Sequence, residues 1–399
     1  GQEQFEVDSL GKTQRLLAIK PAQPGQGLML HLDRGLQEKL YQSLDQALKK
    51  LRASGESTRK AAALAINPKD GGIRALVSLP SFDNNLFAQG ISQEELIVLK
   101  NDPNEPFLNR ALAGQYPSGS IIKPLIAAAA LEEKAVKPNQ TIDCQGGLAI
   151  ANEYNPEIIY HFPDWKAHGL TDIIKAIAES CNVFFYTIGG GYGKIDGLGI
   201  NKIKEYLQDF GLGQTTGIDL PYEQIGLIPD PDWKAKAKEG EPWYLGDTYH
   251  LAIGQGDILV TPLQMALAIS AIANNGTLYQ PQVVDKIIDQ DKDLIKDVFP
   301  QKVRENFIDL SNLKIVQQGM RQAVLTGSAR ALASLPVTAA GKTGTAQFGN
   351  QDKTHAWFVG YAPYQEPEIV IVVLIEAGGG GDQTAVPVAK EVLEWYFSQ

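Results

Sequence analysis

A serine and a lysine lie three residues apart in the apolar stretch "YPSGSIIKPLIAAAALEEK". If the chain is helical from Ser120 onward, the side chains of Ser120 and Lys123 share one face near the electropositive start of the helix. A serine hydroxyl is a weak nucleophile that needs a base nearby, and a partly neutral lysine can be that base. An isolated pair of this kind is more often a capping serine beside a lysine that extends to solvent. The pair therefore indicates catalysis only if other segments supply partners.

Two further motifs supply such partners. Ser180 and Asn182 form an S-x-N at the end of a helical run in "AESCNVFFY", and "AAGKTGTAQF" carries a K-T-G-T that begins at Lys342. Singly, the first pair could be a helix end and Lys342 a solvated turn lysine. The three motifs together, in this order, are typical of penicillin-binding proteins and serine β-lactamases.

From about Gly27 to its C-terminus the chain resembles a penicillin-binding protein transpeptidase. The resemblance is closest to the class B, elongation-type branch that includes penicillin-binding protein 2, although "PSGSIIK" stands where "PPGSTFK" is common. It implies an α+β fold, with a five-stranded antiparallel sheet covered by helices and packed against an all-helical part across a cleft. The segments that carry it are "NPKDGGIRALVSLPSFDNNLF", "FLNRALAGQYPSGSIIKP", "FGLGQTTGIDLP", "IGQGDILVTPLQMALA" and "AWFVGYAP".

The resemblance gives each motif residue a role in acyl transfer. Ser120 would form the acyl-enzyme, and Lys123 would take the serine proton. Lys342, as a second cation, would lower the pKa of Lys123 and attract the substrate carboxylate. Ser180 would relay a proton to the leaving amine, and Asn182 would hold Lys123 and the substrate amide.

The strand motif would bind the substrate. Gly344 would leave room for an extended peptide that adds to the strand through main-chain hydrogen bonds. The N–H groups of Ser120 and Thr345 would form an oxyanion hole, in which one donor contributes about 3 kcal/mol. The hydroxyls of Thr343 and Thr345 suit a terminal carboxylate.

The implied function is that of a peptidoglycan D,D-transpeptidase that crosslinks stem peptides and is inhibited by β-lactams. A D,D-carboxypeptidase and a non-catalytic β-lactam sensor are the alternatives. A class A β-lactamase would carry a deacylating glutamate after the S-x-N motif, and the sequence between Asn182 and Lys342 contains no E-x-x-L-N. Catalysis would need no cofactor. The expected partners are stem peptides, β-lactams and a membrane glycosyltransferase of the elongation machinery.

Two cysteines, an aspartate and a histidine form a candidate zinc site. The ligands would be Cys144, Asp164, His168 and Cys181, with Asp143 as a substitute for Cys144. Some elongation-type family members are similar here, with an aspartate, a histidine and a cysteine on this loop. Because both neighbours of Cys181 should face the cleft, its thiol should point away from it. A disulfide between the two cysteines and two free thiols remain open alternatives.

The pattern along the chain predicts the elements that position these motifs. A leucine stripe predicts a helix after Asp33, and residues 61–79 predict two strands. The middle of the chain is mostly helical, with "TPLQMALAISAIANNG" capped by Thr261 and ended by Gly276. Three strands follow in residues 339–378, and then a helix over 384–395. This order favours an α+β fold whose antiparallel sheet is built from both ends of the chain.

Composition sets the remaining expectations. The 399 residues are 44% hydrophobic and 21% charged, with a net charge of −10 that argues against a nucleic-acid partner. Residues 1–27 end in "KPAQPGQG" and predict a linker, or the tail of a missing N-terminal pedestal region, before a transpeptidase domain over 28–399. Together with the resemblance, this start predicts an upstream transmembrane anchor and a place on the extracytoplasmic face of the cell membrane.

Overall fold

The computed structural model describes residues 1–152, 155–349 and 353–399. Contacts divide these residues into two compact units. The first unit joins Gly1–His31 to Val284–Phe299, and the second joins Leu32–Val283 to Pro300–Gln399. All three sequence motifs lie in the second unit.

The first unit is made of strands. A hairpin is formed by β1 (Gln2–Val7) and β2 (Thr13–Lys20), where the sequence predicted a linker or the tail of a module. A three-stranded sheet has the order β12-β11-β3, with β3 at Gly27–Leu30, β11 at Val284–Ile288 and β12 at Leu294–Asp297. At the predicted boundary near residue 27, β3 begins and pairs with β11, a strand far away in the sequence.

The second unit is built on the predicted five-stranded antiparallel sheet. Its order is β14-β15-β16-β4-β5, so strands from both ends of the chain meet at the β16–β4 pair. The central strands are buried on both faces, which explains the continuous apolar run "IVIVVLI" in β16. The strands are β4 (Ala61–Ile66), β5 (Ile73–Leu79), β14 (Ala340–Gln347), β15 (Thr354–Ala362) and β16 (Ile369–Ile375).

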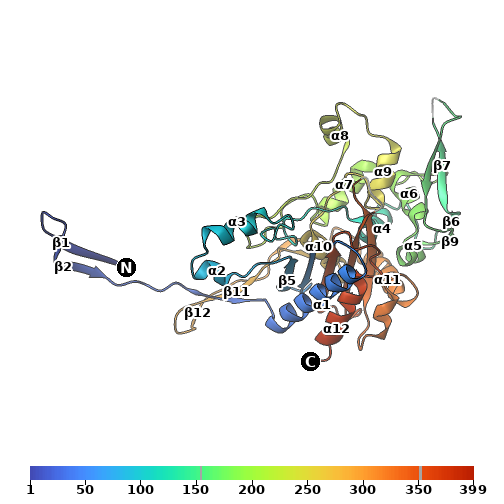
Figure 1. Ribbon diagram of the computed structural model, residues 1–399. Helices are drawn as coiled ribbons and strands as arrows, with labels where there is room; N and C mark the ends of the chain where they lie inside the picture. Colours follow the sequence, from blue (N-terminus) through green and yellow to red (C-terminus); the bar gives the residue numbers. More distant parts are fainter. Residues whose placement is uncertain (153–154, 350–352) are drawn as a thin grey trace. The chain divides into compact units, whose positions relative to one another are not determined.

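Helices cover both faces of this sheet. On one face α1 (Arg34–Ala53) and α12 (Ala385–Tyr396) lie side by side (Figure 1). The predicted helix begins after Asp33, which caps α1 by accepting a hydrogen bond from the N–H of Leu36. On the other face α10 (Pro262–Ala273) is buried along its whole length and begins with the predicted Thr261 cap.

The all-helical part contains the S-x-N motif and contacts β14 of the sheet through its last helix. Its helices are α4 (Lys123–Glu132), α5 (Ile173–Glu179), α6 (Asn182–Gly190), α7 (Gly199–Asp209), α8 (Pro231–Ala237), α9 (Leu245–Ala252) and α11 (Leu310–Leu325). In the part of the chain that the structure describes, no helix is both long enough and apolar enough to cross a membrane.

Short elements complete the second unit. The predicted helical middle also holds two small antiparallel ladders, β6–β9 and β7–β8, that the sequence pattern did not indicate. Three candidate zinc ligands lie in or beside these ladders: Cys144 in β6, Asp164 directly after β8 and His168 directly before β9. The remaining elements are α2 (Asn85–Ala88), α3 (Gln93–Asn101), η1 (Gly119–Ile122), η2 (Arg330–Ser334), β6 (Ile142–Cys144), β7 (Gly147–Ala151), β8 (Ile159–Pro163), β9 (Gly169–Thr171), β10 (Leu278–Tyr279) and β13 (Lys302–Arg304).

Candidate active site

The segment that carries Ser120 is a 3₁₀ turn pressed against the edge strand of the sheet. Ser120 lies inside η1 and does not cap the helix, which begins only at Lys123. The α-helix therefore begins three residues later than the sequence pattern predicted, and Gly119, with φ of +54°, bends the chain before it. A Cβ on Gly119 would lie 3.1 Å from the Cβ of Ala346 on β14. The turn and the K-T-G-T strand are therefore in direct contact.

Lys123 brings the first two motifs together. Its side chain is completely buried, and Nζ donates hydrogen bonds to the Ser180 carbonyl oxygen at 2.8 Å, Ser180 Oγ at 3.2 Å and Asn182 Oδ1 at 2.6 Å. Among the described residues none of its hydrogen bonds reaches Ser120 Oγ. Catalytic hydrogen bonds of this type often tighten only when substrate is bound. The lysine is thus held by the S-x-N motif, three residues after Ser120 in the chain.

The pKa of Lys123 suits a general base. Burial lowers it from 10.5 to about 8, while the charges of Asp164 and Cys181 act in the opposite direction. Removal of the ammonium from water is the main cause of this lowering. At this pKa about one tenth of the lysine is neutral at pH 7.

Lys342 lies on β14 and is also completely buried. Its Nζ donates one hydrogen bond, to the Thr343 carbonyl oxygen at 3.0 Å. Burial, and then the nearby charge of Lys123, hold its pKa well below the ordinary value. A solvated turn lysine is ruled out by this burial. A charged Lys342 gains most from an anion that enters the site, because few protein acceptors surround it.

The three residues of the S-x-N motif face two directions. Ser180 caps the end of α5 in the left-handed conformation, with φ of +60°, and Cys181 caps the start of α6. This turn directs Ser180 and Asn182 to Lys123, whereas the Cys181 sulfur accepts a hydrogen bond from the N–H of Phe184 at 3.3 Å. The predicted opposite orientation of Cys181 is confirmed.

The K-T-G-T strand meets the nucleophile segment at Gly344. A Cβ there would lie 3.0 Å from Ile121 Cγ2 and 3.2 Å from the Ser118 carbonyl oxygen. The glycine therefore lets η1 approach the strand, a reason that differs from the predicted space for a peptide. Thr345 is exposed, and the Thr343 hydroxyl, 7% exposed as a residue, is placed toward the loop that follows α11.

Comparisons with known proteins agree with this geometry. The protein family described as "Penicillin binding protein transpeptidase domain" matches residues 61–394 of this chain. The chain belongs to the penicillin-binding protein transpeptidase family.

Relatives place the chain within this family. "Peptidoglycan D,D-transpeptidase MrdA" of Haemophilus influenzae is 35% identical over 424 residues, which cover 100% of this chain and 60% of that protein. PBP2 of Pseudomonas aeruginosa, solved in complex with WCK 5153, is 32% identical with a TM-score of 0.80, and the match covers 94% of this chain and 80% of that one. A chain of a solved peptidoglycan synthase complex is 32% identical with a TM-score of 0.83, over 99% of this chain and 67% of that one. The chain spans about three fifths of the length of the curated relative.

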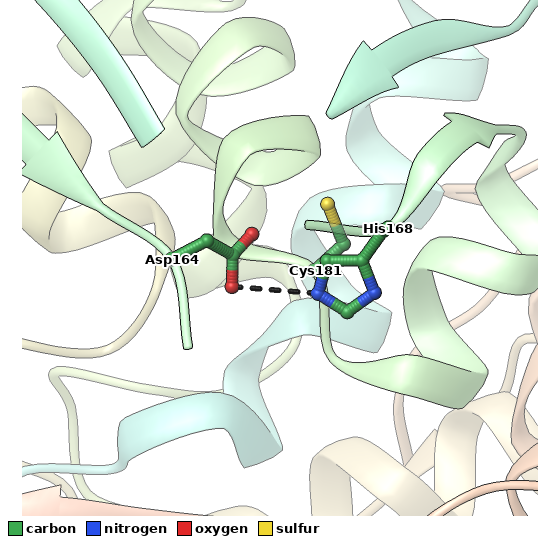
Figure 2. A group of neighbouring side chains, drawn as sticks. All are labelled: Asp164, His168 and Cys181. Carbon is green, nitrogen blue, oxygen red and sulfur yellow. Dashed lines mark ion pairs between the residues drawn. The ribbon is translucent and has the colours of Figure 1, made fainter. Parts of the chain in front are cut away.

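A second cluster of polar side chains lies on the far side of the S-x-N turn of this penicillin-binding protein. Asp164, His168 and Cys181 each offer an atom, and these atoms lie within 4.8 Å of one another (Figure 2). His168 Nδ1 is 2.9 Å from a carboxylate oxygen of Glu179, while its buried Nε2 has no hydrogen-bond partner among the described residues. Nε2 instead lies 3.5 Å from Asp164 Oδ1. An imidazole bonded through one nitrogen to a carboxylate, with the other nitrogen free, is the usual state of a metal ligand.

The donor set fits zinc, but with three ligands where four were predicted. Neither Cys144 nor its substitute Asp143 belongs to the group found among the described residues. Cys144 is buried with its sulfur 3.7 Å from the Ile142 carbonyl oxygen, and Asp143 is exposed and accepts a hydrogen bond from Gln145. Both cysteines are free thiols in the structure, so the alternative disulfide between them is not formed there.

Two residues that touch these clusters were missed by sequence reasoning. Glu179 holds His168, and Ser328 contacts Thr343. Glu179 directly precedes the S-x-N motif, but its partner lies eleven residues earlier on a loop. Ser328 belongs to no motif, and only the fold brings it to the strand.

Proposed function

We propose that this chain is the catalytic domain of a peptidoglycan D,D-transpeptidase that acts through an acyl-enzyme on Ser120. The observation that carries the proposal is the buried Lys123, which is hydrogen-bonded to Ser180 and Asn182 and lies next to the Ser120 turn. The names of the relatives support the same activity.

In the acylation step, Ser120 Oγ attacks the carbonyl carbon between the two terminal D-alanines. Lys123, in its neutral form, takes the hydroxyl proton. The C–N bond breaks as Ser180 passes its own proton to the leaving amine and receives the proton held by Lys123, which leaves Lys123 neutral again. The N–H groups of Ser120 and Thr345 would stabilise the tetrahedral oxyanion. Lys342 and the Thr343 hydroxyl would hold the terminal carboxylate.

In the second step, an amine of another stem peptide attacks the ester. Its proton passes to Lys123, the ester C–O bond breaks, and Ser120 recovers its proton. A β-lactam would follow only the first step, because its leaving nitrogen stays tethered in the opened ring and blocks the acceptor. The residues of the chain supply every proton transfer, and catalysis needs no cofactor.

One assay separates this function from its alternatives. Purified enzyme is given a synthetic donor stem peptide and an amine acceptor, and crosslinked and hydrolysed products are counted beside the decay of a fluorescent penicillin label. Crosslinked product supports the transpeptidase. Hydrolysis alone would indicate a carboxypeptidase, and a stable label with neither product would indicate a sensor. Ser120→Ala should lose all label and product, and Ser334→Ala, which changes an exposed serine, should keep both.

We also propose a structural zinc ion held by Asp164, His168 and Cys181. When bound, the ion would supply a fixed crosslink between the loop and the start of α6. The carboxylate of Asp164 already accepts a hydrogen bond from the N–H of Val183 at 2.9 Å, so the loop contacts the helix that carries Asn182. The orphaned nitrogen of His168 supports this proposal.

The remaining proposals concern the cellular setting. We infer a membrane-anchored protein on the extracytoplasmic face that works with a glycosyltransferase of the elongation machinery. The support is the likeness to a chain of a peptidoglycan synthase complex and to a curated transpeptidase. Co-purification of the full gene product with a membrane glycosyltransferase tests the partner. A gene product with no apolar segment before the present Gly1 would overturn the anchor.

A further inference from the structure

The loop that follows α11 makes a close contact with the K-T-G-T strand. Ser328 Oγ lies 2.5 Å from Thr343 Oγ1, and either hydroxyl can be the donor. Ser328 is exposed, whereas Thr343 is buried, with only 7% of its surface exposed. None of the three catalytic motifs contains Ser328.

The loop and the helix before it are held against two other segments, α5 and the residue that precedes β14. A Cβ on Gly327 would lie 2.2 Å from the Ala178 carbonyl oxygen, so only glycine allows the loop to lie against α5, two residues before Ser180. At the other side, Arg321 Nη1 on α11 donates to the Ala339 carbonyl oxygen at 2.8 Å, immediately before β14 begins. The α11 segment therefore connects the second motif with the third, and Ser328 stands at the connection.

We propose that Ser328 is a positioning residue that orients the Thr343 hydroxyl for the substrate's terminal carboxylate. The inference rests on the proposed function, because it assigns that carboxylate to Thr343. A carboxylate only accepts hydrogen bonds, so Thr343 must donate its proton to it. The Thr343 oxygen can then accept from Ser328, and a hydroxyl that accepts one hydrogen bond donates the next more strongly. A bound carboxylate thus selects the arrangement in which Ser328 donates its proton to Thr343 and Thr343 donates to the carboxylate.

This role predicts an effect that depends on the charge of the ligand. Without Ser328, the Thr343 hydroxyl keeps its position on the strand but loses the partner that fixes its rotamer. Ligands with a free carboxylate should lose affinity, and ligands whose carboxylate is masked should not. A general loosening of the loop would slow both kinds of ligand equally.

The test uses benzylpenicillin and its methyl ester as probes. The second-order rate constant for acylation is measured by intact-protein mass spectrometry for wild type, Ser328→Ala, Ser328→Thr and Ser334→Ala. Ser328→Ala should lower the benzylpenicillin rate about tenfold, which corresponds to the loss of the hydrogen bond from Thr343 to the charged carboxylate. Its ester rate should stay within about twofold of wild type, because no charged acceptor is present. Ser328→Thr keeps the hydroxyl and should retain most of the benzylpenicillin rate, and Ser334→Ala should match wild type.

A double-mutant cycle tests whether Ser328 acts through Thr343. In a Thr343→Val background, Ser328→Ala should change the benzylpenicillin rate by less than about twofold. Equal losses for acid and ester, or no loss for either, would overturn the positioning role. If neither probe acylates the wild type, the proposed function itself fails. An acylated wild type with an unselective Ser328→Ala variant refutes this inference alone.

Discussion

Two clusters of polar side chains flank the turn between α5 and α6, and they differ in completeness. On one side, Ser180 and Asn182 satisfy the buried ammonium of Lys123 with three hydrogen bonds. On the other side, Cys181 faces Asp164 and His168, and the buried Nε2 of that histidine has no hydrogen-bond partner among the described residues. The residues of the chain satisfy the polar groups of the first cluster, whereas His168 Nε2 in the second cluster is left without a hydrogen bond among them. Three successive residues thus alternate between the two clusters.

The largest expected effect comes from Lys123, because the first cluster is built around its ability to lose a proton. Lys123→Arg keeps the positive charge but cannot serve as a base at neutral pH. The rate of penicillin acylation should fall about 10³-fold, within the range of general-base catalysis. Stopped-flow or quenched labelling measures it, with exposed Lys137→Arg as the matched control. An arginine variant that acylates at more than one tenth of the wild-type rate would refute the role.

The second expectation concerns pH. The reactive form of Lys123 is the neutral amine, and burial lowers its pKa to about 8. The acylation rate should therefore level off above pH 8 and fall about tenfold for each unit below it. The groups that face the amine are Lys342 on β14, Asp164 and Cys181 on the far side of the turn, and the Phe185 ring, whose centroid is 5.3 Å from Nζ. A rate that does not change between pH 6 and pH 9 would contradict the assignment.

Much of the first cluster could be predicted from sequence, since its residues fall in short motifs whose chemistry is recognisable. The sheet was predictable for a similar reason, because strands such as β16 are continuous apolar runs. The start of α4 was predicted three residues too early, since the positive φ of Gly119 cannot be inferred from helix-forming neighbours.

The second cluster shows where sequence reasoning ends. Three of its predicted residues lie together, and the fourth predicted ligand, Cys144, is outside the group found among the described residues although its thiol is next to that of Cys181. Glu179 and Ser328 act through partners on other segments. The union of Gly1–His31 with Val284–Phe299 was missed for the same reason, since strand pairing between distant segments leaves no local pattern.

The third expectation is a loss of metal and of thermal stability in His168→Ala. Protein purified without chelator should contain one zinc ion per chain in wild type and none in the variant. At a metal concentration near 1,000 times Kd, the bound ion contributes about 4 kcal/mol, which corresponds to about 5 °C in Tm for a domain of this size. Metal analysis and thermal unfolding measure both effects. His161 is exposed on β8, so His161→Ala should change neither. Zinc that persists in His168→Ala would exclude this site.

The smallest expected effect tests whether the two clusters communicate through charge. Asp164 and Cys181 raise the pKa of Lys123 in the structure, which opposes the larger effect of burial. A divalent cation bound to both residues would compensate their negative charge, and the pKa of Lys123 should then be lower in the loaded protein. Removal of the metal should therefore shift the acid limb of the acylation profile upward by a fraction of a pH unit, with the plateau rate nearly unchanged. The measurement compares pH profiles of chelator-treated and zinc-reloaded enzyme, with Cys181→Ser treated in the same way as the control. A lower plateau with an unshifted limb would show that the metal acts only by holding Ser180 and Asn182 in place. An identical profile in both states would show that the clusters share a turn but are energetically independent.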